Sequence, residues 1–230
     1  MKIAIIPARG GSKRIKNKNI VDFLGKPLIY YSLQVAKESG LFDQIHVSTD
    51  SEEIKNIVES LGFSVDFMRD PVLADDYVGT LPVVRWVLQT YQTRQQHYDD
   101  VCLILPTASL IEPDDLRNSY RLFESLEKKY SILPVASYPA PIEWAFSQRE
   151  SGVLDACQPN MFQVRSQDLE KKYFDTGTFV WFSKEHAQSD ALAGDEGFAS
   201  YVLDRYKAVD INDREDLEFA KVIKLGLQCR

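Results

Sequence analysis

The sequence opens with a short apolar segment, residues 3–6, that runs directly into a polar loop ending at Asn19. Four consecutive aliphatic residues predict a buried strand, and Pro7 is expected to end it because proline has no N–H for a β-ladder. Gly10 and Gly11 allow the loop backbone to come close to a bound group and to direct N–H groups at it. This strand and loop therefore predict a ligand site near the N-terminus.

Basic residues are concentrated in the same stretch. Residues 1–19 contain six Lys and Arg and no acid, so the rest of the chain, with 21 basic and 34 acidic residues, carries a net charge of −13. An isolated basic loop on an acidic protein favours a small polyphosphate over nucleic acid, which requires a basic face. A solvated loop without a ligand is the alternative. The loop matches neither GxxxxGK[ST] nor GxGxxG.

Strand-like and helix-like patterns alternate along the chain, as periodicity and turn residues indicate. The predicted strands are residues 3–6, 44–48, 64–68, 101–105, 132–137, 178–182 and 208–211. The predicted helices are residues 27–39, 51–61, 81–95, 113–129 and 213–225. This alternation predicts an α/β fold with a three-layer, doubly wound, mainly parallel, Rossmann-like sheet. Ligands in such sheets bind beyond the carboxyl ends of the strands.

Length and composition favour one large domain spanning residues 1–230, with 44% hydrophobic residues to form its core. The N-terminal apolar run is too short for a signal peptide, and no stretch approaches the roughly 20 apolar residues of a membrane span. Cys102, Cys157 and Cys229 lack the spacing of a disulfide framework or zinc site. We therefore expect a cytoplasmic protein with reduced thiols and with no membrane or nucleic-acid partner.

Several polar residues near the expected sheet edge have two interpretations. Asp50 is expected to cap the following helix, the alternative being a polar group that faces a nucleotide. Asp75 and Asp76 precede a helix and are expected to stabilise its positive end, with a metal site as the alternative. His46 is expected to be a strand side chain without a chemical role.

The string PARGGSKRIKNKN resembles the signature of the sugar-activating cytidylyltransferases that make CMP-nonulosonates. The resemblance implies the nucleotide-diphospho-sugar transferase type of fold and a loop that grips the triphosphate of CTP. The residues alone indicate only a polyphosphate. By resemblance the nucleotide-binding positions in this loop are Ala8, Arg9, Gly10, Gly11, Ser12, Lys13, Lys18 and Asn19.

A second segment, RDPVLADDYVGT, is similar to the family's RPxxLxxDxxxT stretch, with one extra residue between Arg and Pro. The resemblance places Arg69 and Thr80 near the base and ribose. A third segment, PTASLIEP, resembles the family's PTSPLR at the sugar site. Sialic acid enzymes of the family place Gln before Pro-Thr, whereas this chain has Leu105. The loss of that hydrogen bond argues against sialic acid as the substrate.

The pattern changes between residues 138 and 176, which lack a helical period and are long for a connection. The resemblance implies that this 138–176 segment packs against a second subunit and contributes to the sugar pocket, so we expect a homodimer. Its strings YPAPIEWAF, RSQDL and YFDTGTF look most like the pseudaminic acid branch of the family. The sugar-binding residues expected here are Arg165, Gln167, Asp168, Tyr173 and Asp175, in addition to Leu105.

Arg165 is the expected partner of the sugar carboxylate, because a guanidinium matches two carboxylate oxygens. A surface cation, or an ion pair with Asp168 or Glu170, is the alternative and ranks first without the family resemblance. Near the C-terminus, VDIND resembles the family's DID motif, in which two acids bind Mg²⁺. Here the pair is Asp210 and Asn212 at an expected strand end, and Asn removes one negative charge.

Together the resemblances imply that CTP and a nonulosonic acid, with pseudaminic acid the best match, give the CMP-sugar and pyrophosphate for surface glycan or flagellin glycosylation. The expected catalytic residues are Arg9, Lys13, Lys18 and Asp210, with Mg²⁺ as the cofactor. One alternative is a CMP-legionaminic or CMP-sialic acid synthetase. The other is a non-catalytic nucleotide-binding protein in which Asn212 marks the loss of a metal site.

Overall fold

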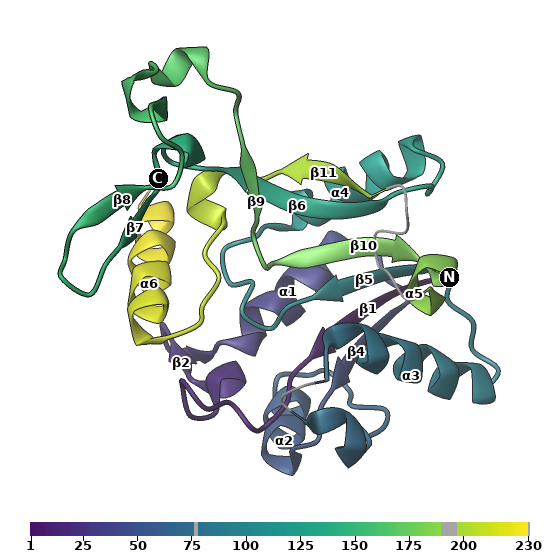
Figure 1. The fold of residues 1–230 in the computed structure, drawn as a ribbon. Coiled ribbons are helices and arrows are strands. Elements are labelled where there is room, and N and C mark those ends of the chain that lie inside the picture. Colours follow the sequence, from purple (N-terminus) through teal and green to yellow (C-terminus); the bar gives the residue numbers. More distant parts are fainter. Residues whose placement is uncertain (76–77, 190–196, 230) are drawn as a thin grey trace.

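The computed structural model describes residues 1–75, 78–189 and 197–229. A seven-stranded sheet forms its centre, with helices on both faces (Figure 1). The sheet strands are β1 Lys2–Pro7, β4 Gln44–Ser48, β5 Asp100–Ile104, β6 Ser131–Ser137, β9 Tyr173–Asp175, β10 Phe179–Ser183 and β11 Phe198–Val202. The helices are α1 Ile29–Ser39, α2 Glu52–Ser60, α3 Thr80–Thr93, α4 Pro113–Ser125, α5 Lys184–Gln188 and α6 Arg214–Gln228.

The strand order is β11-β6-β10-β5-β1-β4, and β9 pairs with β6 outside this path. β1 is parallel to both β4 and β5, and β11 is parallel to β6. β10 is antiparallel to β5 and β6, and β9 is antiparallel to β6. Five strands therefore point one way and two the other, so the predicted mainly parallel α/β fold is confirmed.

Apolar clusters on the two faces of the sheet make it the middle of three layers. One face packs against α1, α2 and α4 through a cluster that contains Leu33, Val58 and Phe123. The other face packs against α3 and α5 through Val87 and Ala187. In the part of the chain that the structure describes, no helix is long and apolar enough to span a bilayer.

Two predicted strands are wrong. Residues 64–68 do not pair with the edge strand β4 and are joined to the core through their side chains. Phe67 stacks on His46 at 4.4 Å between ring centroids, and Gln44 Nε2 donates to Asp66 at 2.9 Å. Residues 208–211 also lie outside the sheet. An alternating pattern marks which side chains are buried, but it does not require the backbone to join a ladder.

Two predicted helix starts are also corrected. α1 begins at Ile29, because Pro27 belongs to the short antiparallel pair of β2 Asp22–Phe23 and β3 Lys26–Pro27. α2 is capped by Ser51, whose Oγ accepts from the backbone N–H of Ile54 at 3.4 Å. The expected capping by Asp50 is therefore wrong. Asp76 lies outside the described residues.

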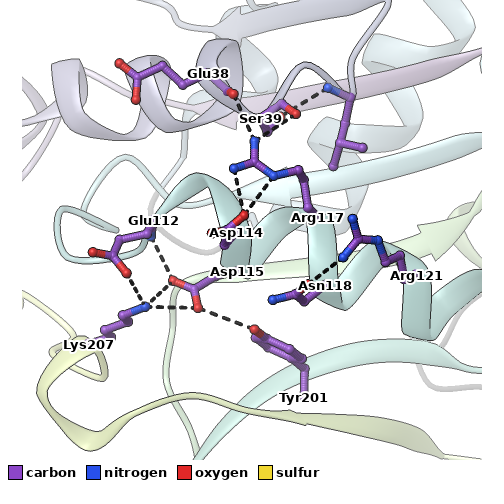
Figure 2. Close-up of polar contacts among 11 residues, drawn as sticks. Glu38, Ser39, Glu112, Asp114, Asp115, Arg117, Asn118, Arg121, Tyr201 and Lys207 are labelled. Carbon is purple, nitrogen blue, oxygen red and sulfur yellow. Dashed lines mark hydrogen bonds and ion pairs between the residues drawn. The ribbon is translucent and has the colours of Figure 1, made fainter.

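A buried ion cluster ties the region before α6 to the start of α4 (Figure 2). Lys207 Nζ lies 2.8 Å from Asp115 Oδ2 and 2.7 Å from Glu112 Oε2. Burial lowers the pKa of Lys207, but its hydrogen bonds to these two carboxylates outweigh that effect and raise it. Tyr201 Oη donates to the same Asp115 at 3.4 Å. The cluster fixes the turn Arg205–Lys207, three residues before Asp210.

The 138–176 segment leaves the sheet after β6 and returns to it as β9, forming the green projection in Figure 1. It contains the hairpin of β7 Phe146–Gln148 and β8 Leu154–Ala156. Trp144 Nε1 donates to the carbonyl of Met161 at 3.1 Å and holds the segment together. Phe146 and Phe162 contact one another but remain 44% and 63% exposed. The segment therefore presents aromatic surface to its surroundings.

Candidate functional site

A cleft of about 590 Å³ opens at the carboxyl ends of β1 and β5. The loop after β1, the start of α3, the loop after β5 and the chain before α6 form its walls. We call it the basic cleft. Its lining residues are Pro7, Arg9, Ser12, Lys13, Arg14, Lys18, Asn19, Arg69, Val78, Gly79, Thr80, Val83, Leu105, Pro106, Thr107, Asp210 and Asn212.

The charge of the basic cleft is strongly positive. Its described lining contains five cationic side chains and one carboxylate, although the whole protein has a net charge of −7. The cations come from the N-terminal loop and from the segment after α2, and the carboxylate comes from the chain before α6. Such a concentration of positive charge in a concave site attracts a small polyanion.

The N-terminal loop is held in place by polar contacts from behind. The backbone N–H of Gly10 donates to Asp50 Oδ1 at 3.0 Å, and Asn19 Nδ2 donates to the carbonyl of Arg9 at 2.9 Å. A Cβ at Gly10 would lie 3.1 Å from Cβ of Ser51, so close packing explains glycine there. The Gly10 N–H is thus engaged by Asp50 in this structure. Ala8 is fully buried beneath the loop.

Gly11 differs from Gly10, because a Cβ there would meet nothing within 4 Å. The structure therefore gives no packing reason for glycine at this position. The space beside Gly11 leaves room for a group bound above the loop.

Lys18 joins the loop to the opposite wall. Its Nζ donates to the carbonyl of Ile211 at 2.8 Å. Burial lowers the pKa of Lys18, the nearby Asp210 opposes this shift, and Arg14 and Arg9 reinforce it. Mutual repulsion among these cations would be relieved by a bound polyanion. Lys18 therefore has both a structural contact and a charge directed at the cleft.

Arg69 forms the back wall and is only 5% exposed. Its Nε donates to Ser48 Oγ at 3.0 Å and its Nη2 to the Ser48 carbonyl at 2.6 Å. Burial lowers the pKa of Arg69 to about 10, with Asp50 opposing the shift and Arg9 reinforcing it. The guanidinium remains charged at neutral pH. Thr80, the first residue of α3, lies on the same cleft.

Asp210 and Asn212 face the cleft from the chain before α6, although this chain is not the predicted strand. Asn212 Nδ2 donates to Asp210 Oδ2 at 2.7 Å, and Arg14 Nη2 donates to Asn212 Oδ1 at 2.8 Å. Gly177 has φ +59°, and a Cβ there would lie 3.2 Å from Asp210 Cγ. Glycine at 177 thus leaves space for the carboxylate. Asp213 caps α6, because its side chain accepts from the backbone N–H of Asp216.

Asp210 supplies the one carboxylate in the described lining of the basic cleft. Among the described residues, no group of three His, Cys, Asp or Glu side chains could hold a metal ion alone. Mg²⁺ bound with a nucleotide commonly takes one or two carboxylates and fills its other positions with phosphate oxygens and water. The single carboxylate of Asp210 fits that second arrangement. Asn212 does not act as its predicted co-ligand here, because its Nδ2 faces Asp210 and its Oδ1 accepts from Arg14.

The predicted sugar-binding residues are divided in space. Leu105 lines the basic cleft and also an adjoining apolar pocket of about 250 Å³, which has Asp175 at its edge. Gln167 lines a separate hollow of about 320 Å³. Arg165 Nε is paired with Asp168 Oδ2 at 2.8 Å, with the arginine side chain 71% exposed. Arg165, Gln167, Asp168 and Tyr173 are absent from the described lining of the basic cleft.

Sequence reasoning missed some of the cleft. Arg14 was counted only as part of the loop charge, yet it contacts Asn212 across the site. Thr107 lies in the loop directly after a buried strand, where ligands bind in such sheets. The signal for Thr107 was the resemblance of its segment, PTASLIEP, to a sugar-site motif. The contact of Arg14 joins residues 198 positions apart and has no local signal.

Comparisons with known proteins agree with this geometry. Residues 3–221 match the family described as Cytidylyltransferase. The chain is 39% identical over 222 residues to a pseudaminic acid cytidylyltransferase of Campylobacter jejuni, and the match covers 96% of this chain and 95% of the relative. It is 33% identical over 169 residues to a CMP-N,N'-diacetyllegionaminic acid synthase of Legionella pneumophila, covering 73% and 69%.

A solved structure also resembles this chain. It is a CMP:2-keto-3-deoxy-manno-octonic acid synthetase complexed with CTP. The structural match includes 100% of this chain and 99% of the synthetase chain. The TM-score is 0.70 at 15% sequence identity. This likeness shows the shared α/β fold.

Proposed function

Because the chain belongs to the cytidylyltransferase family, an enzyme family, we propose that it transfers CMP from CTP to a nonulosonic acid, with pseudaminic acid as the acceptor. The basic cleft carries the proposal, since five cationic side chains surround a space of about 590 Å³ at the carboxyl edge of the sheet. The relative named for pseudaminic acid is 39% identical to this chain, against 33% for the relative named for legionaminic acid, which supports pseudaminic acid as the acceptor.

The reaction joins the anomeric hydroxyl of the acid to the α-phosphorus of CTP. The hydroxyl oxygen forms a bond to the α-phosphorus, the bond from that phosphorus to the bridging oxygen breaks, pyrophosphate leaves and the hydroxyl proton passes to solvent. Catalysis of this kind depends on positioning and on neutralising charge. Arg9, Lys13 and Lys18 line the cleft, and we assign to them the stabilisation of the departing pyrophosphate.

Arg69 and Thr80 also line the basic cleft, and we place the base and ribose beside them. Asp210 would hold Mg²⁺, which supplies further neutralisation of phosphate charge when bound. The buried Arg69 is held by Ser48, so the back wall is fixed before the nucleotide arrives.

The acceptor is placed beside Leu105. The apolar pocket that Leu105 shares with the basic cleft suits carbon-bound parts of the sugar, and Asp175 at its edge suits a hydroxyl or amide donor. An apolar residue at this position supports pseudaminic acid over sialic acid, because it offers no hydrogen bond.

Completion of the acceptor site is assigned to a second copy of the chain. Arg165, Gln167, Asp168 and Tyr173 lie on the 138–176 segment and away from the basic cleft of their own chain. The segment also exposes Phe146 and Phe162, which suits a subunit contact. A homodimer in which this segment reaches the partner's cleft accounts for both observations. We place the enzyme in the cytoplasm, where CTP is available.

Pyrophosphate release from CTP with Mg²⁺ tests the proposal. The assay compares pseudaminic, legionaminic and sialic acids, each with and without enzyme. We expect release with pseudaminic acid to be fastest, with the CMP-sugar as the second product. If legionaminic or sialic acid is turned over faster than pseudaminic acid, the faster acid is the acceptor and the assignment of pseudaminic acid is wrong. Release with none of the acids, despite CTP binding, would favour the non-catalytic alternative.

A further inference from the structure

Three side chains form a continuous hydrogen-bonded link across one end of the basic cleft. Arg14 Nη2 donates to Asn212 Oδ1 at 2.8 Å, and Asn212 Nδ2 donates to Asp210 Oδ2 at 2.7 Å. We call this the amide bridge. Only a side chain with both an acceptor and a donor satisfies these two neighbours at once, and a carboxamide has both.

A carboxylate at position 212 would behave differently. It could accept from Arg14, but it has no N–H for Asp210, so two carboxylate oxygens would face each other across the 2.7 Å contact. Two carboxylates that share a site repel unless a proton or a cation lies between them. Asparagine therefore allows Asp210 to hold its position without any ion.

The backbone that carries the amide bridge is fixed by separate contacts. Lys18 Nζ donates to the carbonyl of Ile211 at 2.8 Å, and the backbone N–H of Asn212 donates to Asp216 Oδ2 at 2.8 Å. Gly177 lies against Asp210 on the other side. All of these contacts are made by protein atoms, so the protein itself supplies what fixes this wall.

We propose that Asn212 is a positioning residue: through the amide bridge it holds Asp210 and Arg14 in place without a divalent ion. The ion then binds with the nucleotide rather than before it, because one carboxylate offers too little charge alone. Arg14, held by Asn212, is presented to the polyphosphate as an additional fixed cation. The inference rests on the proposed function only for the identity of the nucleotide.

The test uses Mn²⁺ without nucleotide and does not depend on turnover. Mn²⁺ binding, followed by electron paramagnetic resonance, should be weak for the wild type and at least about tenfold tighter for Asn212→Asp, which adds a carboxylate ligand. In EDTA, Asn212→Asp should melt roughly 2–4 °C below the wild type, and Mn²⁺ should restore the loss. The wild type should melt at the same temperature in EDTA and in Mn²⁺.

Two variants serve as controls. Asn118→Asp makes the same substitution on α4, where the exposed Asn118 accepts from Arg121 at 3.0 Å, and should change neither Mn²⁺ affinity nor its effect on melting. Asn212→Ala removes the amide bridge without adding charge, so it should leave Mn²⁺ binding weak while raising the KM for CTP through the loss of a positioned Arg14.

Three results would overturn the inference: tight nucleotide-free Mn²⁺ binding by the wild type, unchanged Mn²⁺ affinity in Asn212→Asp, or unchanged KM in Asn212→Ala. If Asn212→Asp does not fold in EDTA but folds in Mn²⁺, the inference is supported. If no acid is turned over while the Mn²⁺ results are as expected, the proposed function fails and the amide bridge stands.

Discussion

The basic cleft and the 138–176 segment are built in opposite ways. Residues of the cleft come from both ends of the chain and are fixed by contacts with buried or distant partners, as between Lys18 and Ile211. Charged residues of the 138–176 segment pair with near neighbours, as Arg165 does with Asp168 and Arg149 with Asp155. The basic cleft gathers its charges within one chain, whereas the 138–176 segment presents exposed side chains and a separate hollow of about 320 Å³.

This difference separates two tasks of the proposed enzyme. A nucleotide triphosphate needs fixed charges, and the body of the fold provides them. The acceptor needs groups that the single chain does not bring to the cleft, and the 138–176 segment carries candidates for them. Substitutions in the two regions should therefore affect different measurements.

The largest effect is expected from Lys18→Ala in the cleft. Loss of one fixed cation that stabilises the leaving group should lower kcat by about 100-fold or more, as for other single donors to a developing charge. Stopped or continuous pyrophosphate assays give kcat, and circular dichroism checks the fold. Lys16→Ala is the matched control, because Lys16 is exposed in the same loop and is absent from the described cleft lining. Equal kcat values for the two variants would remove Lys18 from the mechanism.

The second effect concerns the stability of the two regions. Lys207→Met should lower the free energy of unfolding by about 3 kcal/mol, because it leaves the buried Asp115 without its cation. Arg149→Ala breaks an exposed pair in the 138–176 segment and should leave chemical denaturation unchanged. If Lys207→Met unfolds at the same urea concentration as the wild type, the ion cluster does not fix the chain before Asp210.

The third effect is a pH dependence that originates in the core beneath the cleft. Burial lowers the pKa of His46 to about 4, with Asp66 opposing the shift and Arg69 and Arg94 reinforcing it. The unfolded chain binds this proton near pH 6.5 and the folded protein does not. Stability is therefore full above about pH 6.5 and falls as the pH drops toward 4, by about 3 kcal/mol in all.

Urea unfolding of wild type and His46→Gln at several pH values between 7.5 and 4.5 measures this contribution. The difference in the free energy of unfolding between the wild type and His46→Gln should shrink as the pH falls, because only the wild type must keep a buried imidazole neutral. His97→Gln, a change at an exposed histidine, should follow the wild type. Parallel curves for wild type and His46→Gln would show that another group causes any acid sensitivity.

The smallest effect is expected in the 138–176 segment. Arg165→Ala should raise the KM for the acid by about tenfold, through loss of a charge-assisted hydrogen bond, and leave the KM for CTP unchanged. Arg149→Ala is the control within the same segment. A changed KM for CTP, or an unchanged KM for the nonulosonic acid, would place Arg165 outside the acceptor site.

Mixed dimers extend this comparison. If the partner supplies Arg165, a dimer of one Lys18→Ala chain and one Arg165→Ala chain has one fully wild-type site. In an equal mixture about half of the dimers are of this kind, so about a quarter of all sites should regain wild-type activity. If the activity of the mixture equals the mean of the activities of the two unmixed variants, each chain uses its own Arg165.

Local patterns were sufficient for much of the fold and for the cleft loop. Residues 44–48 form a strand as predicted, and the cations of the loop are adjacent in sequence and therefore visible together. Strand 198–202 was missed because its pairing with β6 joins distant parts of the chain. Ser51 and Asp50 are both good caps, and the contact of Asp50 with Gly10, 40 residues away, decides between them.

The acceptor residues show a different limit of sequence reasoning. The motif around Arg165 indicates a role but not the chain whose cleft it serves, and its ion pair with Asp168 was the alternative that the residues themselves favoured. The resemblance assigned this motif to the sugar rather than to the nucleotide, but its exposed position away from the basic cleft is a property of the folded chain.

A crystal structure of the protein with CTP tests the central claim most directly. We predict the triphosphate within hydrogen-bond distance of Lys18 Nζ, Arg9 and Lys13, with the cytidine toward Arg69 and Thr80. A nucleotide bound away from the basic cleft, or one whose phosphates point away from the N-terminal loop, would contradict the account.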